Sequence, residues 1–223
     1  MPTAAQIAPL RSNLATVTRL ARRELDAFWA TLDKTDMVKG RRALEEFFPA
    51  LVEQYGNVAS IVAADWYEDV YQEYSALASA DVNAEQVNAR MRWAISEAFG
   101  GDPDQALSTL GMVTDELVKQ FGRDTVIGSA DSNNRAYARV PTGSDTCAFC
   151  IMLASRGFVY SSSKAAGELS KFHGDCDCAI VAEDGVVPEG YDPDELYEKY
   201  QNAHVSGSTK ETLSNLRSDL GTH

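Results

Sequence analysis

The 223-residue sequence lacks a run of about eighteen apolar residues, which a helix needs to cross a membrane. Its first residues, MPTAAQIAPLRSNL, also lack the apolar middle of a signal peptide. The fingerprints GxGxxG, the P-loop and GxSxG are absent, so nothing points to a dinucleotide-binding enzyme, a P-loop NTPase or an α/β-hydrolase. We therefore expect a chain that neither spans a membrane nor leaves the cytosol through a Sec signal.

Positive charge is scarce. The formal net charge is -13, which argues against the sequence-independent phosphate binding that a basic surface provides. Residues 1–42 are the exception, because they hold eight Lys or Arg and four Asp or Glu, a balance of +4, and the remaining residues carry -17. A basic segment on an acidic body suggests a partner at the N-terminal end. A solvated helix face explains the same charges equally well.

The apolar residues of the N-terminal part recur at helical spacing. Leu10, Leu14, Val17, Ala21, Leu25, Phe28 and Leu32 follow one another at intervals of three or four, which predicts a helix over residues 9–33. This face is expected to be core, with a partner surface as the alternative. Further apolar stretches predict helices over residues 44–55, 57–78, 87–99 and 102–121.

Glycine and proline set the expected limits of these helices. Pro49 should open or kink the second helix, and Gly56 should end it. Asp102 and Pro103 give an N-cap and first-turn signal for the last one. We therefore expect a helical domain over residues 1–122.

The pattern becomes short and irregular after Gly122. RGFVY (156–160) and CAIVAE (178–183) have strand-like composition and could pair. Residues 123–185 then form a small module with too few regular elements to hold its shape without a staple. Residues 186–223 read as an acidic tail with a helix near 208–219. The predicted fold class is mainly α, with a zinc-stapled α+β module.

All four cysteines and one of the three histidines fall within residues 147–178. A CxxC pair places two thiolates on one tetrahedral ion, and a second short turn supplies the other ligands. The candidate zinc ligands are Cys147, Cys150, His173, Cys176 and Cys178, five for about four positions. Paired disulfides and reduced cysteines without metal are the alternatives, and the absence of a signal peptide disfavours the disulfides.

No catalytic arrangement emerges around these residues. The zinc deaminases place H-x-E before the CxxC, whereas here the CxxC comes first. An HNH-type nuclease needs a further histidine, and only His204 and His223 remain besides His173. We expect no enzymatic activity, and no fused protease, because helices, module and tail account for all the residues.

Two stretches resemble a known family. ARVPTGSDTCAFCIMLASRGFVYSSSKAA followed by FHGDCDC is similar to the C-terminal module of MuF-like phage head morphogenesis proteins. YGNVASIVAADWYEDV is similar to the helical region before that module, so the resemblance covers residues 50–185. It implies a minor capsid protein that is made in the host cytoplasm beside the portal and enters the head interior in few copies. Its implied role is to assist head assembly or DNA delivery.

The expected partners are the portal or the major capsid protein, bound through the N-terminal helix, and packaged DNA. Two other functions stay open. The first is a zinc-dependent nucleic-acid enzyme or toxin packaged with the genome, which would show an open metal position near Asp145 or Asp175. The second is a cytosolic zinc-binding adaptor of the host, which would not associate with capsids.

Overall fold

The computed structural model describes residues 2–78, 82–143, 146–159, 178–185 and 187–221. These residues form eight helices and one two-stranded sheet, which confirms the prediction of a mainly α fold. The helices are α1 (Ala4–Thr31), α2 (Met37–Val70), α3 (Ala84–Ala94), α4 (Ser96–Phe99), α5 (Pro103–Ser132), α6 (Ala148–Ala154), α8 (Pro193–Ala203) and α9 (Thr209–Leu220). The strands are β1 (Tyr137–Val140) and β2 (Ala179–Ala182).

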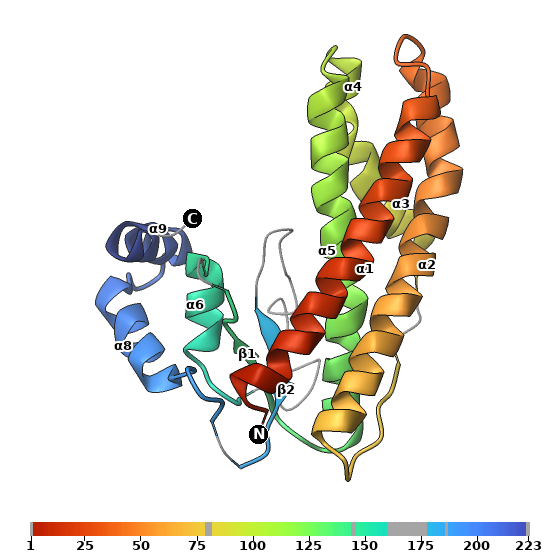
Figure 1. Cartoon of the computed structure of the whole chain (residues 1–223). Helices are drawn as coiled ribbons and strands as arrows, with labels where there is room; N and C mark the ends of the chain where they lie inside the picture. Colours follow the sequence, from red (N-terminus) through yellow and green to blue (C-terminus); the bar gives the residue numbers. More distant parts are fainter. Residues whose placement is uncertain (1, 79–81, 144–145, 160–177, 186, 222–223) are drawn as a thin grey trace.

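The long helices α1, α2 and α5 pack side by side into a bundle (Figure 1). Side chains cap the start of each one. Thr3 and Gln6 form a capping box on α1, and the carboxylates of Asp36 and Asp102 accept backbone N–H groups in the first turns of α2 and α5. The apolar face of α1 is buried against its neighbours, so the expectation that it is core is confirmed.

Helix α2 continues through Pro49 and Gly56, so the predicted helix end at Gly56 is wrong. Gly56 lies where α2 crosses α5, and a Cβ at this position would come 2.7 Å from the ring of Phe121. The missing side chain of Gly56 therefore lets α2 and α5 approach closely. Gly56 does not form the turn that its position in the sequence suggested. The two helices predicted over 44–55 and 57–78 are one.

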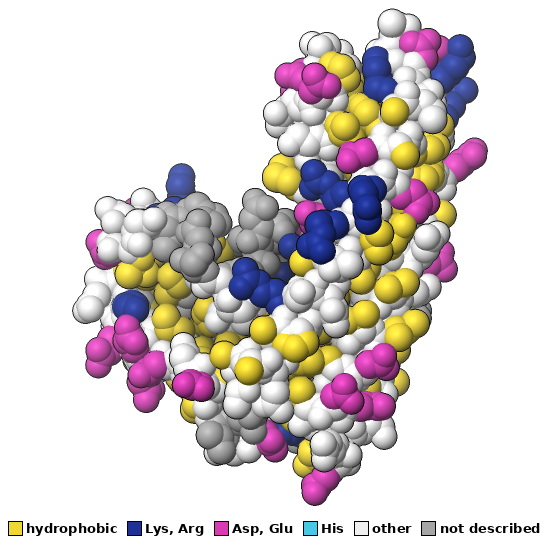
Figure 2. Space-filling view, viewed as in Figure 1, with side chains coloured by type: hydrophobic (Ala, Val, Ile, Leu, Met, Phe, Trp, Pro, Cys, Tyr) yellow, Lys and Arg dark blue, Asp and Glu magenta, His cyan; other side chains and the backbone are white. Residues whose placement is uncertain are grey.

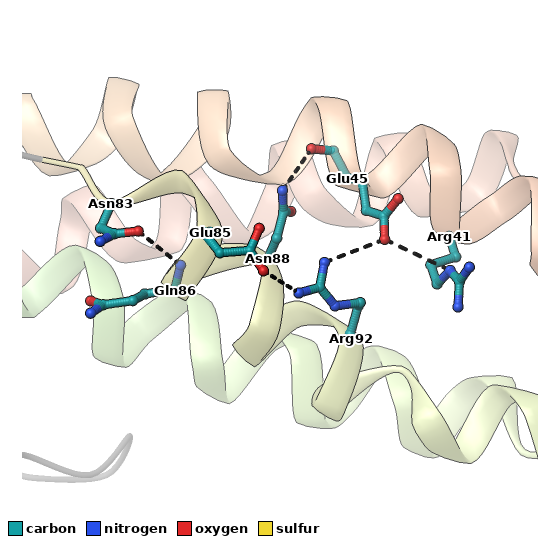
Figure 3. Close-up of polar contacts among 7 residues, drawn as sticks. All are labelled: Arg41, Glu45, Asn83, Glu85, Gln86, Asn88 and Arg92. Carbon is teal, nitrogen blue, oxygen red and sulfur yellow. Dashed lines mark hydrogen bonds and ion pairs between the residues drawn. The ribbon is translucent and has the colours of Figure 1, made fainter.

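Polar contacts fix the short helix α3 on α2 (Figure 3). The Arg92 guanidinium reaches Glu85 on its own helix at 2.8 Å and Glu45 on α2 at 3.5 Å. Asn88 donates a hydrogen bond from Nδ2 to the backbone carbonyl of Glu45 at 3.2 Å. Partly exposed ion pairs of this kind contribute little stability, so their main effect is to orient α3.

Helix α5 runs ten residues past Gly122, where the sequence predicted the end of the helical domain. The polar residues after Gly122 are accommodated because their hydroxyls bond to the preceding turn. Thr125 Oγ1 donates to the carbonyl of Phe121 at 2.9 Å, and Ser129 Oγ donates to that of Thr125 at 2.6 Å. The expected boundary between residues 122 and 123 thus falls inside a helix.

Strand β2 confirms the strand predicted in CAIVAE, but its partner is not RGFVY, with which it could have paired. The antiparallel partner is β1, with Tyr137 opposite Ala182 and Val140 opposite Ala179. Residues 157–159 of RGFVY are not in a strand. All four residues of β1 are buried. The strand therefore lacks the alternation of buried and exposed residues by which a strand is predicted from sequence.

Helices α6, α8 and α9 form a C-terminal lobe around Leu153, Ala203 and Leu216. Helix α9 confirms the last predicted helix, and α8 starts at Pro193 behind the Asp192 cap. The two strands lie between this lobe and the lower ends of α1 and α5 (Figure 1). An open angle therefore separates the lobe from the upper part of the bundle.

The contact at Gly56 generates a stability prediction. Gly56→Ala should lower the free energy of unfolding by about 1 to 3 kcal/mol, because the added methyl overlaps the buried Phe121 ring. Gly128→Ala is the matched control: it also lies inside a long helix, but its Cβ would have no neighbour closer than 3.9 Å. The control should raise stability by up to about 1 kcal/mol through helix propensity. Urea unfolding measures both, and equal effects of the two changes would contradict the close helix crossing.

Candidate functional site

One buried cluster joins the lower end of the bundle to the strands and α6. It contains Ile7 and Leu10 of α1, Ala63 and Trp66 of α2 and Val126 of α5. The same cluster contains apolar side chains of β1 and β2 together with three cysteines. A second cluster, built from α1 to α5, fills the upper bundle. The strands are therefore packed into the bundle core at one end, while the other end of the bundle has a core of its own.

Tyr71, directly after α2, connects the two parts through its hydroxyl. The hydroxyl accepts a hydrogen bond from the Ala182 N–H and donates one to the Ala182 carbonyl, both at 3.0 Å. Tyr71 is 3% exposed, and this burial raises its pKa. One side chain thus satisfies two backbone groups of β2, as a third strand would.

Arg135 lies two residues before β1 and contacts Tyr71 from that side. Its guanidinium lies over the rings of Tyr71 and Tyr74, at 4.4 and 4.5 Å from their centroids. It also donates to the carbonyl of Glu183 and pairs with Asp184 at 3.2 Å. A buried guanidinium needs such partners, and two aromatic faces with two acceptors supply them.

Three of the five predicted zinc ligands lie in the described part of the chain. Cys147 caps α6, and its Sγ accepts the Cys150 N–H at 3.3 Å. Cys178 stands directly before β2, and all three cysteines belong to the buried cluster of the lower bundle. The other two predicted ligands, His173 and Cys176, fall outside the described residues.

The donor chemistry of these residues fits zinc. The described cysteines form no disulfide with one another, and the N–H···S bond of the CxxC turn is the kind of contact that supports a thiolate. Within the described ranges, no three His, Cys, Asp or Glu side chains gather closely enough to hold a metal ion. The five-residue ligand set consequently remains a prediction.

A groove runs along α1 beside these elements. Its first part lies between residues 4–15 of α1 and the loop 141–143. Its second part, a hollow of about 330 Å³, lies between α1, residues 119–126 of α5 and the start of β2. A separate hollow, which shares no lining residue with the other two, lies beside residues 18–23 and Asp115. We call these three hollows along α1 together the α1 groove.

Lys and Arg side chains gather along α1 on the inner side of the angle between bundle and lobe, as Figure 2 shows. The cationic residues of the α1 groove are Arg11, Arg19, Arg22, Arg23, Lys119 and Arg123. Arg11 fixes the groove locally by donating from Nη1 to the Thr142 carbonyl at 2.6 Å. Part of the positive charge of residues 1–42 thus lies along the α1 groove.

Comparison with known proteins identifies the family. A model of the family described as VG15 protein matches residues 1–203, so the chain belongs to the VG15 protein family. The Gene 15 protein of Mycobacterium phage L5 is 27% identical, over 63% of this chain and 64% of that protein. The Gene 15 protein of Mycobacterium phage D29 is 26% identical, over 63% of this chain and 65% of its own length. The chain thus spans less than two thirds of these relatives, and no solved structure matches it.

This result confirms a phage protein family and leaves the more specific MuF-like resemblance as a hypothesis. In the described residues, no helix combines the length and the apolar character that crossing a membrane requires. Sequence reasoning missed Tyr71 and Arg135, because the contacts that define them join residues 48 to 111 positions apart. The arginines of the α1 groove were visible as a local charge excess, but the groove itself was not.

Proposed function

We propose that this protein is a minor head protein of a phage virion, of the MuF-like type, which assists head assembly or DNA delivery. The observation that supports the proposal most is the family match over residues 1–203, with relatives encoded by two mycobacteriophages. The CxxC and H-x-x-C-x-C pattern in the same chain agrees with the MuF-like module. In this proposal the protein resides inside the head, after synthesis in the host cytoplasm.

The proposed attachment to the portal or the major capsid protein uses the N-terminal helix. The fold changes how this contact is made. Because the apolar face of α1 is buried in the bundle, a partner meets the exposed polar and basic face instead. Deleting residues 1–42 would remove part of the core, so single surface substitutions are the appropriate probes. Contact with packaged DNA is the less favoured role, given the net charge of -13.

The proposed zinc ion has a structural and not a catalytic role. Cys147 and Cys150 are 5% and 0% exposed, and the five candidate ligands are enough to fill a closed tetrahedral shell, which is the coordination of a structural site. When bound, zinc would supply a tetrahedral crosslink between the start of α6 and the segment before β2. Cys147 and Cys150 would hold it from α6, together with His173 and Cys176, and Cys178 is the fifth candidate. A packaged zinc-dependent nuclease or toxin is the alternative, and it requires an open metal position.

The metal prediction is about one zinc per chain in protein purified without added metal. Cys150→Ser should abolish zinc binding, because it removes a thiolate ligand. Ala148→Ser is the control, since it places a hydroxyl at a neighbouring buried position and keeps all four thiols. Elemental analysis measures the zinc content of the wild-type protein and of both variants. A wild-type protein without zinc and with intact disulfides would rule out the structural ion.

The location prediction concerns virions of a phage that encodes this chain. Mass spectrometry of gradient-purified heads, separated from tails, should detect the protein at a few copies per head. Major capsid protein provides the internal standard for this count. If the protein sediments apart from heads and procapsids throughout infection, it is not a head protein, and the cytosolic adaptor becomes the better description.

A further inference from the structure

Two arginines are buried beside the start of strand β2. Arg123 of α5 is 5% exposed, and Arg139 of β1 is 2% exposed. A guanidinium keeps its charge at any physiological pH, and a charge inside a protein core is costly unless negative charge or strong acceptors lie close to it. Two such side chains in one place indicate that this part of the core accommodates negative charge.

Both arginines flank Cys178, the candidate ligand that directly precedes β2. Arg123 and Cys178 line the same hollow of about 330 Å³ in the α1 groove. Arg139 is opposite Ile180 in the antiparallel pair, so these two side chains point to the same face of the sheet. Cys178 comes two residues before Ile180 and lines the same hollow, so it continues this face. Residues diagonal in this way lie about 7 to 8 Å apart, which an arginine side chain spans.

The other described candidate ligands belong to the same core. Cys147 and Cys150 share one buried cluster with Cys178 and with the apolar side chains of both strands. A zinc ion with three thiolates and one histidine carries one net negative charge, and one with four thiolates carries two. The buried cations beside Cys178 match this excess in sign.

We propose that Arg123 and Arg139 are positioning residues of the proposed zinc site. Their guanidiniums offset the negative charge of the thiolate shell on the side where Cys178 lies, and this strengthens zinc binding. The inference rests on the structural zinc of the proposed function. It adds that α5 and β1 contribute to the site through charge, although neither element contains a candidate ligand.

The test measures the zinc Kd of the full-length chain by competition with a chromophoric chelator. Arg123→Met and Arg139→Met each remove the charge and keep most of the side-chain length. Each should weaken zinc binding about tenfold to a hundredfold, the range found for groups that support metal ligands. Arg123→Lys and Arg139→Lys keep the charge, so they should bind zinc within about threefold of the wild-type protein.

Arg135→Met is the matched control for the loss of a buried arginine. Arg135 bonds to the Glu183 carbonyl and pairs with Asp184, beyond the other end of β2 and roughly 15 Å along the chain from Cys178. This change should lower stability but leave the zinc Kd within about threefold.

A second control concerns Asp124, the residue after Arg123. Burial raises the pKa of Asp124, and the neighbouring Arg123 opposes this rise. Asp124 lines a different hollow, between α2, α3 and α5. Asp124→Asn should therefore leave the zinc Kd within about threefold, whereas a loss equal to that of Arg123→Met would show that Arg123 acts through this carboxylate and not on the thiolates.

Cobalt(II) in place of zinc gives a readout that a loss of stability alone does not move. A nearby cation stabilises the electrons of a thiolate sulfur more than those of the more distant metal, so its removal lowers the energy of thiolate-to-cobalt charge transfer. The charge-transfer band of Arg123→Met and Arg139→Met should shift to longer wavelength. The band of Arg135→Met should stay at the wild-type position.

Wild-type zinc affinity in both Met variants overturns this inference alone, and so does an equal loss in Arg135→Met without a band shift. Lys variants that bind as weakly as the Met variants also overturn it, because charge is then not the cause. Circular dichroism with zinc present checks that each variant keeps its helices, and the Lys variants decide where a Met variant does not fold. A wild-type protein that binds no zinc instead contradicts the structural ion itself, and this inference with it.

Discussion

The hydroxyl of Tyr71 joins the end of α2 to strand β2, and the geometry of the lower half of the molecule depends on this contact. A two-stranded sheet is too small to be stable by itself. Here β2 gains hydrogen bonds from Tyr71, Arg135 lies over the Tyr71 ring, and apolar side chains of three helices cover both strands. Cys147, Cys150 and Cys178 belong to the same buried cluster, so this arrangement fixes their positions. It also positions the start of β2, which lines one wall of the α1 groove.

Features that depend on local periodicity were predictable from the sequence. The helical spacing of apolar residues gave α1 and most of α5, because one buried face fixes the period of a helix. Strand β2 followed from its β-branched composition. The cysteine spacing gave a metal hypothesis whose CxxC half has a fitting N–H···S contact. Its other half, around His173, falls on residues that the structure does not describe.

Features that depend on distant contacts were not predictable. The sequence around Gly56 looks the same whether the glycine ends a helix or makes room for the Phe121 ring. Only the crossing of α2 with α5 shows that it makes room for the ring. Gly122 likewise continues α5, since the polar residues beyond it bond to their own helix. The pairing of β1 with β2 spans the whole cysteine segment, and short-range composition favoured the nearer stretch at 156–160. The charge excess at the N-terminus was visible, but its placement along a groove required the packing of α1 on α5.

Amide hydrogen exchange in Tyr71→Phe tests most directly whether bundle and strands form one unit. Loss of the hydroxyl leaves the Ala182 N–H and carbonyl without a partner, at a cost of about 1 to 3 kcal/mol. We expect protection to fall together in β2 and in the lower ends of α2 and α5, while Tyr55→Phe, which removes a less buried bond to Glu24, changes it little. Loss of protection in β2 alone, with the lower helices unchanged, would contradict the account.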